Sequence, residues 1–252
     1  MLRVGFMVSC LSDGFAPRAG EAAVRVLERL GCRVAFPKAQ TCCGQPMVNG
    51  GYDRHARALA KRTAKVFGGF DHVVSPSGSC VATIRNHYPR LLGDEHPFPA
   101  RVWDFVGFVR EVLEVRDLAA LGCAWPGAAA CHRPCHAAEL PYGDQTAALL
   151  AGVAGLTLAP LEDPAECCGF GGTFAVKFPT LSGAMGRDKA ARIADQGARW
   201  VVCNEAGCGL QIAGALERAG VYGVQLKHAA EIVAEGLGLM PRPPLVAGAG
   251  RP

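Results

Sequence analysis

Two short stretches, TCCGQP at residues 41–46 and ECCGFGG at residues 166–172, each contain the sequence Cys-Cys-Gly. The first cysteine of the second copy, Cys167, follows Cys42 by 125 positions. Neighbouring cysteines are poor disulfide partners, because consecutive Cα atoms lie about 3.8 Å apart and a disulfide usually spans roughly 4.4–6.8 Å. Two such pairs in one chain therefore need another explanation.

Other cysteines repeat in register with these two pairs. One cysteine lies 32 positions before each pair, at Cys10 and at Cys135. Further along, VVSPSGSC at 73–80 matches VVCNEAGC at 201–208 with an offset of 128 positions, which one three-residue insertion explains. Each half thus has a cysteine, then Cys-Cys-Gly, then a small residue followed by a cysteine. The sequence predicts an internal duplication.

The overall composition indicates a folded protein and argues against several classes of partner. The 252 residues, 50% hydrophobic and 19% charged, suffice for one large domain or two ordinary ones. The net charge of +4 is spread along the chain, so we expect no nucleic-acid partner. The longest uncharged stretch, residues 146–161, is shorter than the roughly 20 residues of a membrane span, so we expect none.

The twelve cysteines bear on the cellular compartment. The apolar opening at residues 2–8 is short and is soon followed by Asp13, which does not fit a signal peptide. We therefore expect a cytoplasmic protein, in which thiols of this kind serve as metal ligands or redox groups.

Both halves alternate short apolar runs with amphipathic helical segments. This alternation predicts an α/β fold of two similar lobes, each a small, mostly parallel sheet flanked by helices. Sites in such sheets lie at the carboxyl ends of the strands, so we expect the cysteines on loops there. We expect strands at 2–8, 32–36, 72–75, 156–159 and 200–203 and before Cys131, and helices at 18–30, 52–67, 103–115, 144–153 and 181–197.

The duplication also suggests where the chain divides. We expect a first cysteine-rich repeat at residues 1–118 and a second at 119–240, with the boundary after the amphipathic helix at 103–115. Residues 241–252, rich in proline, glycine and alanine, are expected to form a loose tail.

The cysteine pattern favours an iron–sulfur cluster over zinc. Four thiolates from separate loops suit either group, but structural zinc sites usually draw on Cys-x-x-Cys pairs, which neither half contains. Adjacent side chains such as those of Cys42 and Cys43 point in different directions and reach a cluster more easily than a single ion. We expect Gly44 and Gly169 to let the backbone approach inorganic sulfide, with N–H groups donating to cluster sulfurs.

Several longer motifs carry a family resemblance. They are TCCGQPMVNGGY, VVSPSGSC, ECCGFGGTFAVKFP, AMGRDKAARIADQGA and GALERAGVYGVQLKHAAEIV. Over residues 2–238 the chain resembles proteins with two CCG cysteine-rich domains, which occur in heterodisulfide reductase and in the iron–sulfur subunit of glycolate oxidase. It is most similar to the lactate utilization protein A family. The resemblance implies a cytoplasmic iron–sulfur protein needed to oxidise L-lactate to pyruvate beside two partners, a ferredoxin-type iron–sulfur protein and a third lactate-utilization protein.

The resemblance also implies a set of cluster ligands. The fuller family motif ends in Cys-x-x-Cys, but this chain has Ser77 and Glu205 at the earlier position. That departure speaks against five-cysteine, non-cubane clusters and for an ordinary [4Fe–4S] cluster, one or two per chain, with Glu205 not expected as a ligand. The implied ligands are Cys10, Cys42, Cys43 and Cys80 in the first half and Cys135, Cys167, Cys168 and Cys208 in the second.

We expect the remaining cysteines to be structural, because free cysteine is often buried. The histidines near them have several possible roles. His132 and His136 flank Cys135 and are expected either to hold the loop or to serve as a proton donor or a hydrogen-bond partner of the cluster. His228 is expected to pack or to cap the last helix. The four cysteines expected to be structural are Cys32, Cys123, Cys131 and Cys203.

The expected function is electron transfer. Nicotinamide and flavin cofactors handle the removal of a hydride equivalent from lactate, yet the chain has no binding fingerprint for either. We therefore interpret it as an iron–sulfur subunit that exchanges electrons with partners. Whether a small-molecule substrate binds this chain stays open. The alternatives are a glycolate-oxidase or heterodisulfide-reductase type subunit and a non-enzymatic, zinc-stabilised interaction module.

Overall fold

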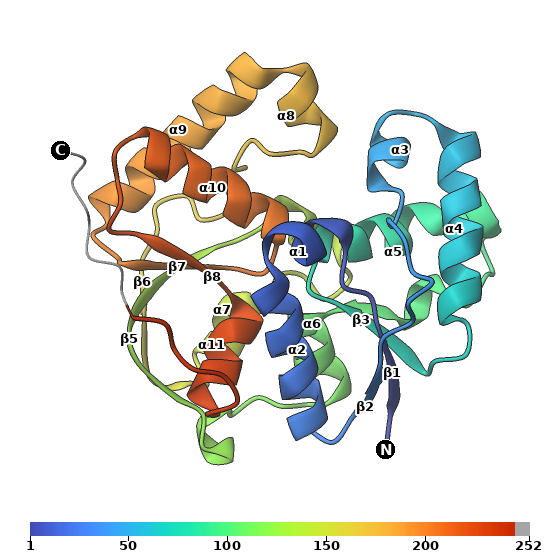
Figure 1. Ribbon diagram of the computed structural model, residues 1–252, viewed down its shortest axis with the longest axis horizontal. Coiled ribbons are helices and arrows are strands. Elements are labelled where there is room, and N and C mark those ends of the chain that lie inside the picture. Colours follow the sequence, from blue (N-terminus) through green and yellow to red (C-terminus); the bar gives the residue numbers. More distant parts are fainter. Residues whose placement is uncertain (245–252) are drawn as a thin grey trace.

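The computed structural model describes residues 1–244 of the chain. It contains two four-stranded parallel sheets with the same strand order (Figure 1). The first, in the order β2-β1-β3-β4, comprises β1 (Arg3–Phe6), β2 (Arg33–Ala35), β3 (His72–Ser75) and β4 (Val102–Asp104). The second, in the order β6-β5-β7-β8, comprises β5 (Ala124–His132), β6 (Ala154–Ala159), β7 (Trp200–Cys203) and β8 (Gln225–His228). The equal order and direction confirm the duplicated α/β fold.

The helices fall into three groups around these sheets (Figure 1). Beside the first sheet are α3 (Gln45–Asn49), α4 (Asp53–Phe67) and α5 (Gly78–Leu92). Beside the second sheet are α8 (Thr173–Lys177), α9 (Pro179–Asp195) and α10 (Ala206–Arg218). Between the sheets are α1 (Cys10–Phe15), α2 (Pro17–Arg29), α6 (Phe105–Gly107) and α11 (Ala229–Gly236). The remaining helical segments are η1 (Pro99–Arg101), η2 (Phe108–Val112), η3 (Ala119–Leu121), η4 (Cys135–Glu139) and α7 (Thr146–Leu150).

One helix begins later in the structure than the sequence predicted. We expected a helix over residues 103–115, but Trp103 lies in β4 and the helical backbone starts at Phe105. Asp104 ends the strand and caps the helix, because its side chain accepts a hydrogen bond from the backbone N–H of Gly107. The helix then continues as a π-helical turn over Phe108–Val112.

The two halves share one central hydrophobic core. Side chains alternate across each strand, so Val74 and Val202 face this core while their neighbours Val73 and Val201 face the outer helices. The core also holds residues from the linking segment, including Leu118. The helices that fill the space between the sheets contribute Ala22, Ala23, Val26 and Leu27 from α2 and Ile232, Val233 and Ala234 from α11. The sheets are therefore held together by a layer to which both halves contribute, and the division between residues 118 and 119 stays a proposal.

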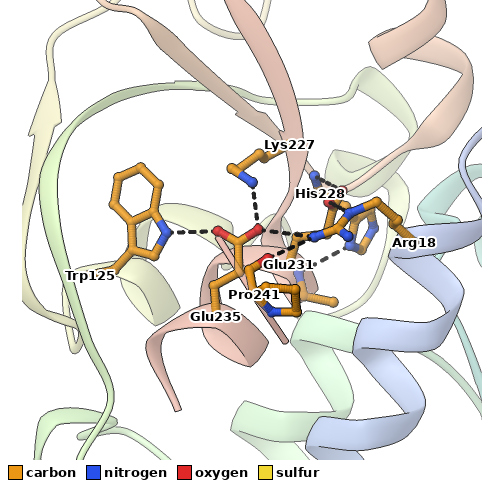
Figure 2. Close-up of polar contacts among 8 residues, drawn as sticks. Arg18, Trp125, Lys227, His228, Glu231, Glu235 and Pro241 are labelled. Carbon is orange, nitrogen blue, oxygen red and sulfur yellow. Dashed lines mark hydrogen bonds and ion pairs between the residues drawn. The ribbon is translucent and has the colours of Figure 1, made fainter. Parts of the chain in front are cut away.

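Buried polar contacts join α2 to α11 in the same layer (Figure 2). Arg18 of α2 reaches Glu231 and Glu235 of α11, each at 3.4 Å. The Glu235 carboxylate, 1% exposed, also accepts from Trp125 Nε1 at 3.0 Å and from Lys227 Nζ at 2.6 Å. Lys227 is 2% exposed, so this ion pair is shielded from water on both sides. The half-exposed Arg18 of the first half thus joins a buried ion pair of the second half, in addition to the apolar packing.

The start of the C-terminal segment contacts the folded chain. The carbonyl of Pro241 accepts a hydrogen bond from Arg18, and the Arg242 guanidinium lies 3.6 Å from the centre of the Trp125 ring. Residues 245–252, most of the tail expected to be loose, lie outside the described residues. Within the part of the chain that is described, none of the helices has the length and apolar character required to cross a membrane.

The buried pair Lys227–Glu235 leads to a stability prediction. Glu235→Gln keeps the side-chain shape but leaves the Lys227 ammonium buried without a counter-charge, which costs about 3 kcal/mol of unfolding free energy. Glu21→Gln is the matched control, because it breaks the half-exposed pair between Glu21 and Arg25, worth below about 1 kcal/mol. Urea denaturation measures both, and equal losses would contradict the role given to Glu235.

Candidate metal centre

Each half brings four cysteines together at the carboxyl ends of its strands. Cys10 and Cys80 follow β1 and β3, and Cys135 and Cys208 follow β5 and β7. These four lie in the first turns of α1, α5, η4 and α10, rather than in loops as expected. The Cys-Cys-Gly pairs lie in irregular backbone that leads toward α3 and α8, and both of these helices lie at the same end of the molecule (Figure 1).

The sulfur atoms of the first set are in direct contact. Cys43 Sγ donates to Cys80 Sγ at 3.1 Å, and the N–H of Gly44 donates to Cys42 Sγ at 3.4 Å. Hydrogen bonds from Cys10 and Cys43 lower the pKa of Cys42 to about 2, while the same contact with Cys42 raises the pKa of Cys10. The set therefore contains one thiolate supported by neighbouring thiols, and the thiolate is the form that binds metals.

The second set repeats this arrangement. The N–H of Gly169 donates to Cys167 Sγ at 3.4 Å, the same distance as in the first half. Hydrogen bonds from Cys135 and Cys168 lower the pKa of Cys167 to about 2. The hydrogen bond to Cys167 raises the pKa of Cys168, which also contacts Cys208. Both halves thus present a contiguous group of four sulfurs around one thiolate.

Exposure to solvent follows the same gradient in each set. The first cysteine of each set, Cys10 or Cys135, is exposed, whereas the second, Cys42 or Cys167, is partly buried. The other members, Cys43, Cys80, Cys168 and Cys208, are buried. All twelve cysteines of the chain are free, and all twelve lie among the described residues. Each set is therefore closed on its inner side and open on the other.

The open sides of the two sets face one cavity of about 570 Å³. All eight cysteines line it: Cys10, Cys42, Cys43, Cys80, Cys135, Cys167, Cys168 and Cys208. Apolar side chains, among them Leu11, Phe170 and Phe174, form much of the remaining wall. Gln45 of the first half meets His136 of the second across this wall, with 3.4 Å between Nε2 of Gln45 and Nε2 of His136. The sequence predicted the two sets but not that they share a cavity.

The chemistry of the donors fits a metal centre in each half. Soft thiolate sulfurs select zinc, copper(I) or iron–sulfur clusters, and hard cations such as magnesium and calcium prefer oxygen. The Gly44 and Gly169 N–H groups point at cysteine sulfur, as expected for residues that support ligated thiolates. The donor chemistry therefore fits the iron–sulfur cluster implied by the sequence and fits zinc equally.

The two glycines have a reason that differs from the expected one. Gly44 and Gly169 have φ values of 89° and 84°, in the left-handed region that disfavours a side chain. A Cβ at position 169 would also lie 2.7 Å from the carbonyl oxygen of Ser182 in α9. Backbone conformation thus favours glycine at both positions, and packing against α9 favours it further at Gly169, while the expected closeness to sulfide stays a prediction.

Ser77 and Glu205, which replace the family's extra cysteines, meet each other between the two halves. Ser77 Oγ donates to Glu205 Oε2 at 3.0 Å, and the N–H of Ser79 donates to the same oxygen at 2.9 Å. The N–H of Gly207 donates to Glu205 Oε1 at 3.2 Å. One carboxylate therefore caps the first turns of both α5 and α10. These bonds support a structural role for Glu205, in line with the expectation that it is not a ligand.

A second row of hydrogen bonds crosses between the halves beside Glu205. Asp104, at the end of β4, accepts from Tyr142 at 2.6 Å and from Asn204, and burial raises the pKa of its carboxyl. His228 Nδ1 accepts from the N–H of Ala230, so Nε2 carries the hydrogen and donates to the carbonyl of Pro76 at 3.0 Å. His228 thus caps α11, which confirms its expected role.

The cysteines expected to be structural lie outside the wall of the cavity. Cys32 and Cys123 are buried, and Cys123 Sγ lies 3.7 Å from the carbonyl oxygen of Val233 in the central core. Cys131 and Cys203 are also buried, and Cys203 Sγ donates to the carbonyl of Glu205 at 3.3 Å. These placements support packing roles for all four.

His132 and His136, treated together in the sequence, occupy different places. His136 lines the cavity, with Nδ1 3.5 Å from Cys135 Sγ. His132 is completely buried, does not line the cavity, and has a ring nitrogen within 4.8 Å of the sulfurs of Cys168 and Cys208. Burial lowers the pKa of His132 to about 4. The sequence pattern gave no sign that only one of these histidines is enclosed behind the thiols.

Comparison with known proteins agrees with the repeat structure. The family model of the CCG cysteine-rich domain matches residues 4–85 and 129–213. Lactate utilization protein A from Exiguobacterium sp. strain AT1b is 39% identical over 248 residues, covering 94% of this chain and 99% of that protein. Lactate utilization protein A from Bacillus cereus strain B4264 is 38% identical, covering 92% of this chain and 98% of that protein.

Similarity to solved structures is weak. An aspartate racemase homologue from Pyrococcus horikoshii covers 94% of this chain and 97% of its own at 11% identity, with a TM-score of 0.34. We infer nothing about this chain from a TM-score of this size.

The buried cap at His228 leads to a prediction of pH dependence. Burial lowers the pKa of His228 to about 4 in the folded protein, while an unfolded histidine titrates near 6.5. Above pH of about 6.5 both states are neutral, and as pH falls from there toward 4 only the unfolded state takes up the proton, so stability falls. At pH 5 this one group accounts for a loss of about 2 kcal/mol relative to pH 7.

His228→Asn tests this prediction, because asparagine retains a helix cap but does not titrate. The difference in unfolding free energy between pH 7 and pH 5 should shrink by about 2 kcal/mol in the variant. His55→Asn, at an exposed position of α4, serves as the control and should leave the difference as it is. An unchanged pH dependence in His228→Asn would refute the assignment.

Proposed function

Because the chain belongs to the family of CCG cysteine-rich domain proteins that includes lactate utilization protein A, we propose that it is an iron–sulfur electron-transfer subunit required for the oxidation of L-lactate to pyruvate. The observation that carries this proposal is the pair of matching four-sulfur sets that face one cavity. The relatives' names supply the substrate class, and the thiolate sets supply the chemistry.

The proposed ligands are the four cysteines of each set. Cys10, Cys42, Cys43 and Cys80 would hold a [4Fe–4S] cluster in the first half, and Cys135, Cys167, Cys168 and Cys208 would hold one in the second. Such a cluster accepts and releases electrons one at a time. The chain supplies lowered thiol pKa values at Cys42 and Cys167 for ligation, and the N–H groups of Gly44 and Gly169 to support those two sulfurs.

Electron transfer fits this chain better than hydride transfer. Conversion of lactate to pyruvate releases two electrons and two protons, and the sequence carries no dinucleotide or flavin fingerprint to accept them as a hydride. The chain would therefore exchange electrons with partners, which we infer to be a ferredoxin-type iron–sulfur protein and a third lactate-utilization protein. The free state of all twelve cysteines is consistent with our placement of the protein in the cytoplasm.

A cysteine replacement series under argon tests the ligand assignment. Cys42→Ser and Cys167→Ser should each lower the iron and acid-labile sulfide content by half if both sets hold a cluster, because each removes one ligand of one set. Cys32→Ser is the matched control, a buried thiol outside the cavity, and should leave both contents unchanged. Stoichiometric zinc without sulfide in the wild-type protein would contradict the proposal and favour a zinc-stabilised interaction module.

Deletion of the gene separates the substrates. Loss of growth on L-lactate with normal growth on glycolate is the expected result. The reverse pattern would refute the lactate assignment and favour a glycolate-oxidase type subunit.

A further inference from the structure

His132, the last residue of β5, has no hydrogen-bond partner for its ring. Its side chain is completely buried, and neither Nδ1 nor Nε2 meets a partner among the described residues. A neutral imidazole carries one N–H donor, and leaving a buried donor without a partner destabilises the fold. Buried polar groups in native proteins are therefore almost always paired. The ring therefore needs an acceptor nearby, although no atom of the described residues meets it in hydrogen-bond geometry.

The sulfur atoms of the second cysteine set are the acceptors within reach. A ring nitrogen of His132 and the sulfurs of Cys168 and Cys208 all lie within 4.8 Å of one another. The carbonyl of Pro164 influences the ring and raises its pKa slightly, but it already accepts from the N–H of Arg133 at 2.9 Å, and neither ring nitrogen meets it in hydrogen-bond geometry.

The other charged neighbour of the ring is a donor. Lys189, buried beside it, donates to the carbonyl of Asp163 at 2.8 Å and pairs with Glu166 at 3.6 Å. An ammonium group has no lone pair to accept the imidazole N–H. Of these neighbours, the sulfurs of Cys168 and Cys208 can accept from the ring, whereas Lys189 cannot.

The first half has no such donor at the matching position. Met7 lies three positions before Cys10, as His132 lies three positions before Cys135. Met7 is 1% exposed and packs in the core cluster that contains Cys43 and Cys80. A thioether has no hydrogen to donate. The duplicated sites thus differ in one buried group directly behind the cysteines.

We propose that His132 donates an N–H hydrogen bond to the sulfur atoms of the second centre and makes that centre the more easily reduced of the two. The inference rests on the proposed function, since it takes both cysteine sets to hold [4Fe–4S] clusters. One-electron reduction adds negative charge, and a hydrogen bond to sulfur stabilises that charge and raises the reduction potential. The four cysteines already supply one ligand for each iron, so His132 acts as a positioning residue and not as a ligand.

The direct test measures the midpoint potential of the second cluster in His132→Met, which installs the residue of the first half. Cys42→Ser serves as the background in which only the second cluster remains. We expect iron and sulfide contents equal to those of the background, with the reduction equilibrium about tenfold less favourable, a fall of ~59 mV for one electron. His132→Gln keeps an N–H donor and should recover most of the shift.

Met7→Leu, measured in the Cys167→Ser background, is the matched control and should leave the potential of the first cluster unchanged. An unchanged or raised potential in His132→Met would overturn the proposal. If the variant fails to assemble its cluster, pulsed electron paramagnetic resonance of the His136→Gln variant with 15N-labelled histidine decides instead, because His136 Nδ1 also lies 3.5 Å from a sulfur of this set, that of Cys135. Weak nitrogen coupling to one reduced cluster alone is expected, and strong coupling, typical of a nitrogen ligand, or none at all would refute the hydrogen bond.

These outcomes are separate from a failure of the proposed function. A wild-type protein without iron and sulfide would refute the function itself, whereas two clusters of equal potential would refute only the role of His132.

Discussion

The layer of helices shared by the two sheets is the constraint on which the rest of the structure depends. Because α2 and α11 pack against each other between the sheets, the carboxyl ends of both sets of strands point toward the same space. The buried pair of Glu235 and Lys227, together with the half-exposed Arg18, reinforces this layer. Eight cysteines from the two halves of the sequence line one cavity as a consequence.

The hydrogen bonds at the boundary between the two halves fix how the halves meet. Glu205 caps one helix from each half, and Asp104 and His228 make further hydrogen bonds across the same boundary. Buried, hydrogen-bonded polar groups favour one arrangement, because any shift would leave several of them unpaired at once. Ser77 of one half and Glu205 of the other thus meet where the two cysteine sets approach each other.

Much of the fold was predictable, since the cysteine spacing revealed the duplication and apolar runs such as 72–75 and 200–203 marked the inner strands. The edge strands β4 and β8 were missed, because three or four residues containing a charge carry too little periodicity. The eight cysteines were named from sequence, but the shared cavity was not. Its formation depends on long-range packing of α2 against α11, and no local pattern encodes such a contact. The burial of His132 behind the thiols escaped notice for the same reason.

The symmetry of the fold and the asymmetry at His132 together support our proposal of two unequal electron-transfer centres. Both proposed roles require metal bound by sulfur in each half. X-ray absorption of the anaerobically isolated protein tests that most directly. We predict an iron edge with a first shell of sulfur and a second shell of iron, which is the pattern of a cluster. A zinc edge with four sulfur neighbours and no iron would contradict the account.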